Sequence, residues 1–110
     1  MPVDATDPEA REWLSRGDTS LATNRFDDAA DALRLVDALY AAGAERVVVA
    51  SENILDEGEE GWYCDALRVV LPADGAKRAA LFDIVNREAE DEGYDPEFDA
   101  GQTTLFLWWD

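Results

Sequence analysis

Apolar side chains recur at helical spacing in two stretches of the chain, and residues that start and stop helices bracket each stretch. The first runs from a capping aspartate, Asp27 or Asp28, to Gly43, and the second runs from Asp74 to Gly93. Aspartate caps the free N–H groups that begin a helix, and glycine readily takes the left-handed conformation that ends one. The apolar stripes are Ala29, Leu33, Val36 and Tyr40 in the first stretch, and Leu81, Ile84, Val85 and Ala89 in the second. We therefore predict two long amphipathic helices.

Other stretches have the patterns of β-strands. Residues 46–50 contain three consecutive valines, which is typical of a strand with both faces covered. Residues 62–71 and residues 103–109 are each predicted to form a strand, whose successive side chains point to opposite faces of the sheet. A weaker alternation over residues 19–24 predicts a further short strand.

The N-terminal stretch predicts one short helix. Asp7 is suited to cap it, Pro8 to occupy its first position, and Gly17 to end it. We treat residues 1–17 as an extension of a single domain that spans residues 1–110, because a chain of 110 residues has the length of one domain.

The order of these elements predicts a fold class. With a strand over residues 19–24, the chain reads strand, helix, strand, strand, helix, strand, which is the split βαβ or ferredoxin-like arrangement. We therefore expect an α+β two-layer sandwich with a four-stranded antiparallel sheet and both long helices on one face. Many unrelated functions share this architecture, so it does not identify one.

The last strand is apolar on both of its sides, which bears on what covers the sheet. Leu105, Leu107 and Trp109 form one row, and Phe106 and Trp108 form the other. Aromatic rows of this size seldom stay bare on a soluble monomer. Three covers are open: the N-terminal helix, a second copy in a homodimer, or a distinct partner or ligand.

Charge then narrows the classes of function. The chain has 26 acidic and 9 basic residues, no histidine and a formal net charge of -17. Nucleic acids and anionic membranes bind basic surfaces, so we expect neither as a partner. No signal sequence or membrane-length apolar run occurs, and we expect a cytoplasmic protein. The acidity is equally explained by the composition of the host's proteins, in which case it serves solubility.

Few residues are candidates for chemistry. The absence of histidine removes the commonest general base and zinc ligand, and the lone Cys64 lacks a partner that would activate it. The acidic loop with Glu57, Glu59 and Glu60 lacks the calcium-loop spacing, so a solvated loop is favoured over a metal site. Arg68 is suited to bind a carboxylate or phosphate, although an ion pair with a neighbouring acid such as Asp65 is the simpler interpretation.

These observations favour a non-enzymatic acidic binding or regulatory domain that acts through protein–protein contacts, against a basic partner. We expect no cofactor and no metal. The candidate contact residues are Trp62, Arg68, Phe106, Trp108, Glu57, Glu59 and Glu60. The alternative is a small-ligand sensor that uses the open sheet face or a dimer groove, with Arg68 as its anion anchor.

Overall fold

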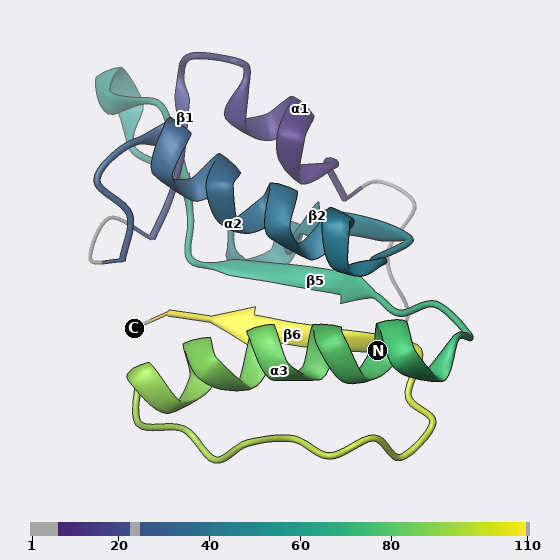
Figure 1. Cartoon of the computed structure of the whole chain (residues 1–110). Helices are drawn as coiled ribbons and strands as arrows, with labels where there is room; N and C mark the ends of the chain where they lie inside the picture. Colours follow the sequence, from purple (N-terminus) through teal and green to yellow (C-terminus); the bar gives the residue numbers. More distant parts are fainter. Residues whose placement is uncertain (1–6, 23–24, 110) are drawn as a thin grey trace.

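Three α-helices and six strands make up the part of the chain that the computed structural model describes, residues 7–22 and 25–109 (Figure 1). The helices are α1 (Ala10–Leu14), α2 (Ala29–Ala42) and α3 (Gly75–Asp91). The strands are β1 (Thr19–Leu21), β2 (Arg46–Val49), β3 (Leu55–Asp56), β4 (Trp62–Cys64), β5 (Ala66–Val70) and β6 (Thr104–Trp108), with short 3₁₀ turns η1 (Ser51–Asn53) and η2 (Gly58–Glu60) on either side of β3. The radius of gyration is 13.4 Å, as expected for a compact chain of this length. The expected α+β class is confirmed.

The two long helices begin and end where their sequence signals lie. The side chain of Asp28 accepts a hydrogen bond from the Asp31 amide at 2.8 Å, and Asp74 accepts one from the Lys77 amide at 2.9 Å. Gly43, with a φ of 115°, ends α2 in the left-handed conformation. The caps satisfy amides that the first turn of a helix leaves unpaired.

The strands form two small sheets, so the expected single four-stranded antiparallel sheet is wrong. β2, β5 and β6 make an antiparallel sheet with β5 in the middle. β1 pairs in parallel with β4, and β3 pairs with the other edge of β4. The predicted strand over residues 62–71 is divided at Asp65 into β4 and β5, one for each sheet. Since β2 and β6 occupy both edges of β5, β1 has no place beside it, and the ferredoxin-like arrangement is not confirmed.

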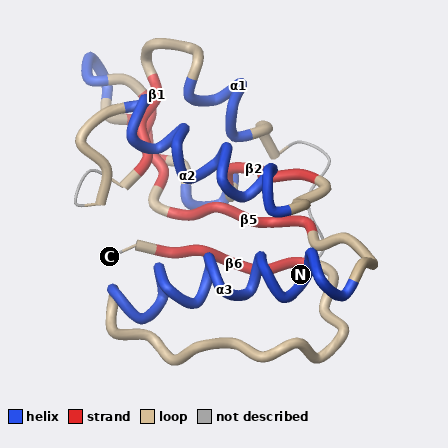
Figure 2. Tube along the Cα trace, viewed as in Figure 1, coloured by secondary structure: helices blue, strands red, loops and turns tan. Residues whose placement is uncertain are grey.

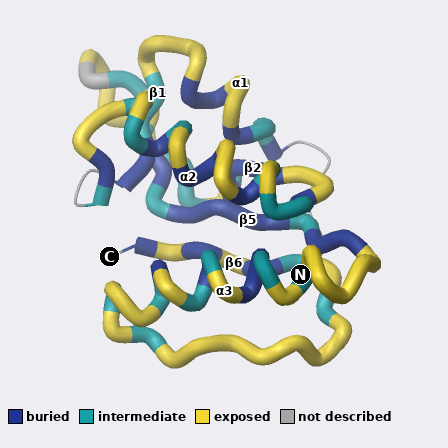
Figure 3. The backbone as a smooth tube through the Cα atoms, in the orientation of Figure 1, coloured by how far each residue is buried: buried dark blue, intermediate teal, exposed yellow. Residues whose placement is uncertain are grey.

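One face of the β2-β5-β6 sheet forms the centre of the core. Its paired residues are all buried: Val47, Val69 and Leu105 in one rung, and Val49, Leu67 and Leu107 in the next. Buried residues of α2 and α3 belong to the same core, among them Val36, Leu39, Leu81 and Val85. Figure 2 shows the helices and strands in the same view, and Figure 3 shows β5 as buried over most of its length.

The N-terminal segment differs from its prediction. The cap of α1 is Glu9 rather than Asp7, because Pro8 and Glu9 pair with the edge of β2 before the helix begins. The Val49 amide donates to the Pro8 carbonyl at 2.8 Å, and Glu9 forms a single antiparallel bridge with Val48. α1 then places Trp13 in the main core, so this helix does not cover Phe106 and Trp108.

Candidate functional site

The second face of the β2-β5-β6 sheet is half covered and half open. Val48, Arg68 and Phe106 lie side by side across the three strands, and Trp108 pairs with Ala66 in the next rung. Val48 and Arg68 are buried, whereas Phe106 and Trp108 are 44% and 41% exposed. The expected alternation of the last strand is therefore confirmed, and three of the predicted contact residues lie together on this face.

Arg68 is neutralised within the protein. Its Nη1 and Nη2 atoms lie 2.7 and 2.9 Å from the two carboxylate oxygens of Glu52, and Nη1 lies 3.7 Å from Asp7 Oδ2. The hydrogen bonds to Glu52 raise the pKa of Arg68 above its ordinary value. The guanidinium also lies over the ring of Phe106, 5.1 Å from its centroid. An anionic ligand would have to displace Glu52 to reach Arg68.

The expected ion pair of Arg68 with an acid of the same chain is confirmed, but its partners are Glu52 and Asp7 rather than Asp65. Asp65 instead accepts hydrogen bonds from Asn53 Nδ2 at 2.9 Å and from Trp108 Nε1 at 3.0 Å. It lies at the break between β4 and β5, three residues before Arg68. Asp65 thus fixes the indole ring of Trp108.

A cavity of about 330 Å³ lies between β6, α3 and the segment that follows α3. Its lining is largely apolar and aromatic, with an amide and two carboxylates: Val85, Asn86, Ala89, Tyr94, Asp95, Glu97, Phe106, Leu107 and Trp108. Tyr94 and Trp108 stack with 5.6 Å between their ring centroids and 11° between their planes. The exposed aromatic pair of β6 therefore belongs to a hollow rather than to a flat surface.

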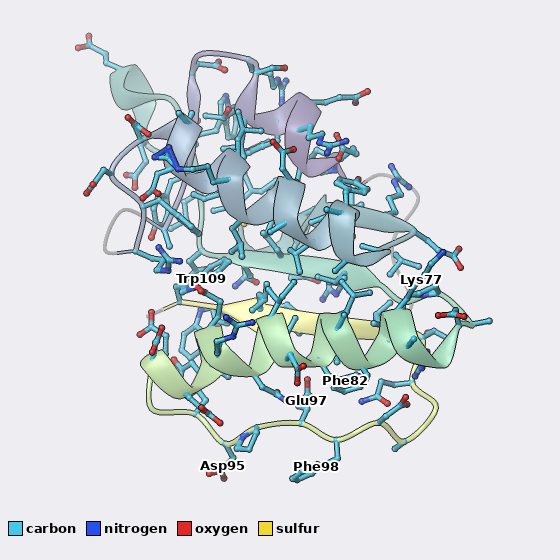
Figure 4. All side chains as sticks on the ribbon, viewed as in Figure 1. Lys77, Phe82, Asp95, Glu97, Phe98 and Trp109 are labelled. Carbon is cyan, nitrogen blue, oxygen red and sulfur yellow. The ribbon has the colours of Figure 1, made fainter. Side chains whose placement is uncertain are left out.

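Two polar clamps hold the segment from residue 94 to residue 102 along α3. Asn86 donates to the Glu97 carbonyl and accepts from the Glu97 amide, both at 2.8 Å. Arg78 bonds both carboxylate oxygens of Asp99, at 3.0 and 2.7 Å, and these bonds lower the pKa of Asp99 to about 2. Between the clamps, Phe98 is 80% exposed and points away from α3, as Figure 4 shows.

The hollow carries negative charge without internal compensation. Asp95 and Glu97 are exposed at its rim, and the partly buried Asp65 lies beside Trp108. Within residues 7–22 and 25–109, none of these three carboxylates forms an ion pair with an arginine or a lysine. We call the group of Tyr94, Asp95, Glu97, Phe106 and Trp108 the β6 surface.

The remaining predicted contact residues lie elsewhere. Trp62 is on β4 and is 41% exposed, and Glu57 and Glu59 are exposed around η2. The side chain of Glu60 lies outside the described part of the structure. Figure 1 places the η2 turn at the end of the molecule opposite to α3 and β6. The structure does not bring these residues to the β6 surface.

Cys64 has the environment of a core residue. It is buried, and its thiol donates to the carbonyls of Ala50 and Ala66 at 3.4 and 3.3 Å. Burial raises the pKa of the thiol to about 11, so the reactive thiolate is scarce at neutral pH.

The described residues contain neither a metal-binding cluster nor a membrane-spanning helix. Across the ranges with assigned positions, no group of three or more acidic or cysteine side chains is placed to hold a metal ion. No helix in the same ranges is long and apolar enough to cross a bilayer.

Three of the five residues of the β6 surface were not predicted from the sequence. Tyr94, Asp95 and Glu97 follow α3 in a segment with neither helical nor strand periodicity. The signal that places them is the side chain of Asn86, which lies on α3 and bonds the backbone of Glu97. A lone asparagine within a helical pattern gives no sign of such a bond.

Comparisons of the chain with protein-family models, with curated proteins and with solved structures found no match. The functional interpretation therefore rests on the contacts of the β6 surface. Those contacts combine half-exposed aromatic rings, an apolar hollow and uncompensated carboxylates.

Proposed function

We propose that this chain is a non-enzymatic binding domain that recognises a cationic segment of another protein at the β6 surface. The observation that carries the proposal is the half-exposed pair Phe106 and Trp108 beside an apolar cavity whose rim bears Asp95 and Glu97. Aromatic rings next to carboxylates suit lysine and arginine, because the ring faces and the carboxylates both attract a cation.

The aromatic row already holds one cation of the protein's own. Arg68 lies over Phe106 at 5.1 Å while Glu52 neutralises its charge. A partner's lysine or arginine at Trp108 would repeat this arrangement with Glu97 or Asp95 as its counter-ion. Trp108 is held for that role by Asp65 on its indole nitrogen and by the stacked ring of Tyr94. A ring that is already ordered loses little entropy on binding.

The charge of the whole chain supports the same kind of partner. A net charge of -17 attracts a cationic segment from a distance and speeds its association at low salt. The same charge disfavours nucleic acids and anionic membranes. In this proposal, α2 and α3 cover one side of the β2-β5-β6 sheet and leave Phe106 and Trp108 on the opposite side for the partner. The protein acts in the cytoplasm.

A second candidate is a sensor of small cationic ligands at the same hollow. A volume of about 330 Å³ lies at the lower end of the range for small-molecule sites. The aromatic stack and the two rim carboxylates favour an organic amine over an anion. A rise in the melting temperature with amines, and none with basic peptides, would favour this function over the first.

The test is selection from a displayed library of random heptapeptides on the immobilised full chain. We expect enrichment of peptides that combine lysine or arginine with apolar residues. Their affinity falls at least about tenfold in Trp108→Ala, because truncation of a central aromatic contact removes most of its binding energy.

Trp62→Ala is the matched control, because Trp62 and Trp108 are equally exposed but lie in different sheets, and Trp62 does not line the cavity beside β6. We expect this variant to bind the selected peptides as the parent does. Enrichment of acidic peptides, or equal binding by the Trp108→Ala and Trp62→Ala variants, would show that the β6 surface is not a site for cations.

A further inference from the structure

The hydrogen bonds at the two ends of β6 show which of its peptide groups face β5. The Leu71 amide donates to the Thr103 carbonyl at 2.8 Å, and the Trp109 amide donates to the Asp65 carbonyl at 3.0 Å. Bonded residues alternate along an antiparallel pair, so the odd-numbered residues of β6 direct their amides and carbonyls to β5.

The even-numbered residues Phe106 and Trp108 therefore direct their amides and carbonyls away from β5. Among the described residues β6 is the last strand of its sheet, so these groups lie along an open edge there. The segment that runs beside this edge is fastened to α3, because both backbone groups of Glu97 bond the side chain of Asn86. The cavity lies between that segment and the strand.

The opposite edge of the same sheet is closed. The Val49 amide donates to the Pro8 carbonyl, and Glu9 pairs with Val48. Uncovered edges invite pairing with another chain, and proteins usually block them. Here one edge is blocked, whereas the other carries two exposed aromatic residues and borders a hollow.

We propose that the open edge of β6 accepts an extended basic segment of the partner as a fourth strand. This inference rests on the proposed function and specifies how the partner binds. Main-chain hydrogen bonds to Phe106 and Trp108 would supply affinity, and alternate side chains would supply specificity, as in other cases of strand addition.

The two sides of the edge specify different side chains in the added strand. On one side, the residues of the segment would enter the cavity against Val85 and Ala89, which suits apolar side chains. On the other side, they would lie beside the rings of Phe106 and Trp108, which suits lysine or arginine. The segment should therefore alternate basic and apolar residues.

Charge selects a basic segment over a second copy of this chain. Two copies paired through β6 would bring together two molecules that each carry a net charge of -17. Each would also place Asp95 and Glu97 near the joint, where like charges oppose association. A lysine-rich segment instead neutralises these groups.

The test uses a capped heptapeptide that alternates lysine and valine, together with two versions methylated on backbone nitrogens. One version is methylated on all its lysine amides and the other on all its valine amides. Only alternate amides of an added strand face its neighbour. In antiparallel addition these are the lysine amides, and in parallel addition they are the valine amides, because paired residues share a face of the sheet.

We expect the unmodified peptide to bind and one methylated version to bind at least about tenfold more weakly, with the other within about twofold. Hydrogen exchange should slow at the Phe106 and Trp108 amides on binding, whereas the Leu107 amide, which faces β5, should not change. Loss of affinity in both versions or in neither would overturn strand addition, as would failure of the unmodified peptide to bind.

The failure of this inference is separable from that of the proposed function. If selected basic peptides bind the parent and not Trp108→Ala, while the two methylated versions of the alternating peptide bind equally well, the surface binds cations through side chains alone. If light scattering shows a dimer that the alternating peptide dissociates, a second copy is the natural occupant of the edge and the proposal of a basic segment is wrong.

Discussion

Asp7 is a carboxylate almost wholly removed from solvent, and Arg68 supplies the charge that compensates it. Asp7 Oδ1 accepts from the Ser51 amide at 3.3 Å. In the described part of the chain, Asp7 Oδ2 has no hydrogen-bond partner, and Arg68 Nη1 lies 3.7 Å from it. Arg68 thus joins the N-terminal segment to β5, and it also forms an ion pair with the half-exposed Glu52.

Removal of Arg68 and removal of the charge on its partner Glu52 should have unequal effects on stability. Arg68→Met leaves Asp7 buried without a counter-charge, and we expect the free energy of unfolding to fall by about 3–5 kcal/mol. Glu52→Gln keeps a hydrogen-bond acceptor at a half-exposed position, and we expect a loss of about 1 kcal/mol or less. Urea unfolding of the two variants measures the difference. An equal loss in both would show that Asp7 does not depend on Arg68.

At the scale of elements, the sheet of β1, β4 and β3 depends on a close approach of two backbones. The Trp62 amide donates to the Asp18 carbonyl at 2.7 Å, directly after Gly61. Gly61 has a φ of 94°, and a Cβ at this position would collide with the Asp18 carbonyl. Glycine is therefore required here both by the conformation and by the space.

Gly61→Ala should separate these two requirements when it is compared with Gly58→Ala. Gly58 also has a positive φ, of 65°, but a Cβ there meets nothing within 4 Å. We expect Gly58→Ala to cost about 1–2 kcal/mol from its conformation alone, and Gly61→Ala to cost more and to disrupt the pairing of β1 with β4. Unfolding curves and hydrogen exchange at the Trp62 amide measure both effects. Similar losses in the two variants would contradict the steric role of Gly61.

The elements were predicted well where their causes are local. α2 and α3 begin at the expected aspartates because a cap and an apolar stripe act within a few residues. The partner of β1 and the break at Asp65 were not predicted, because strand pairing depends on residues far apart in the sequence. Likewise, alternation identified Phe106 and Trp108, whereas the segment opposite them is placed by one side chain of α3.

At the scale of the whole molecule, the net charge should act on folding and on binding in opposite directions. Self-repulsion among the carboxylates disfavours the compact state, and added salt screens it. We expect the melting temperature to rise with sodium chloride by roughly 4 °C, equivalent to about 1 kcal/mol for a domain of this size. Over the same range, the affinity for the alternating peptide should fall.

A series of salt concentrations, followed by thermal unfolding and by titration with the peptide, gives both slopes. A Trp62→Ala variant, which leaves the β6 surface intact, should show the same dependence of stability and of affinity on salt. Parallel movement of stability and affinity would mean that the charge of this chain serves solubility and does not attract the partner.

The covered margin of β2 has a consequence for assembly. Molecules that can join at both ends grow into open filaments, whereas a molecule with one available end stops growth after a single addition. The stretch of Pro8 and Glu9 occupies one end, so any joining at Phe106 and Trp108 is limited to one companion per molecule. Cleavage ahead of Ala10 would free that second end and allow each molecule two companions instead of one.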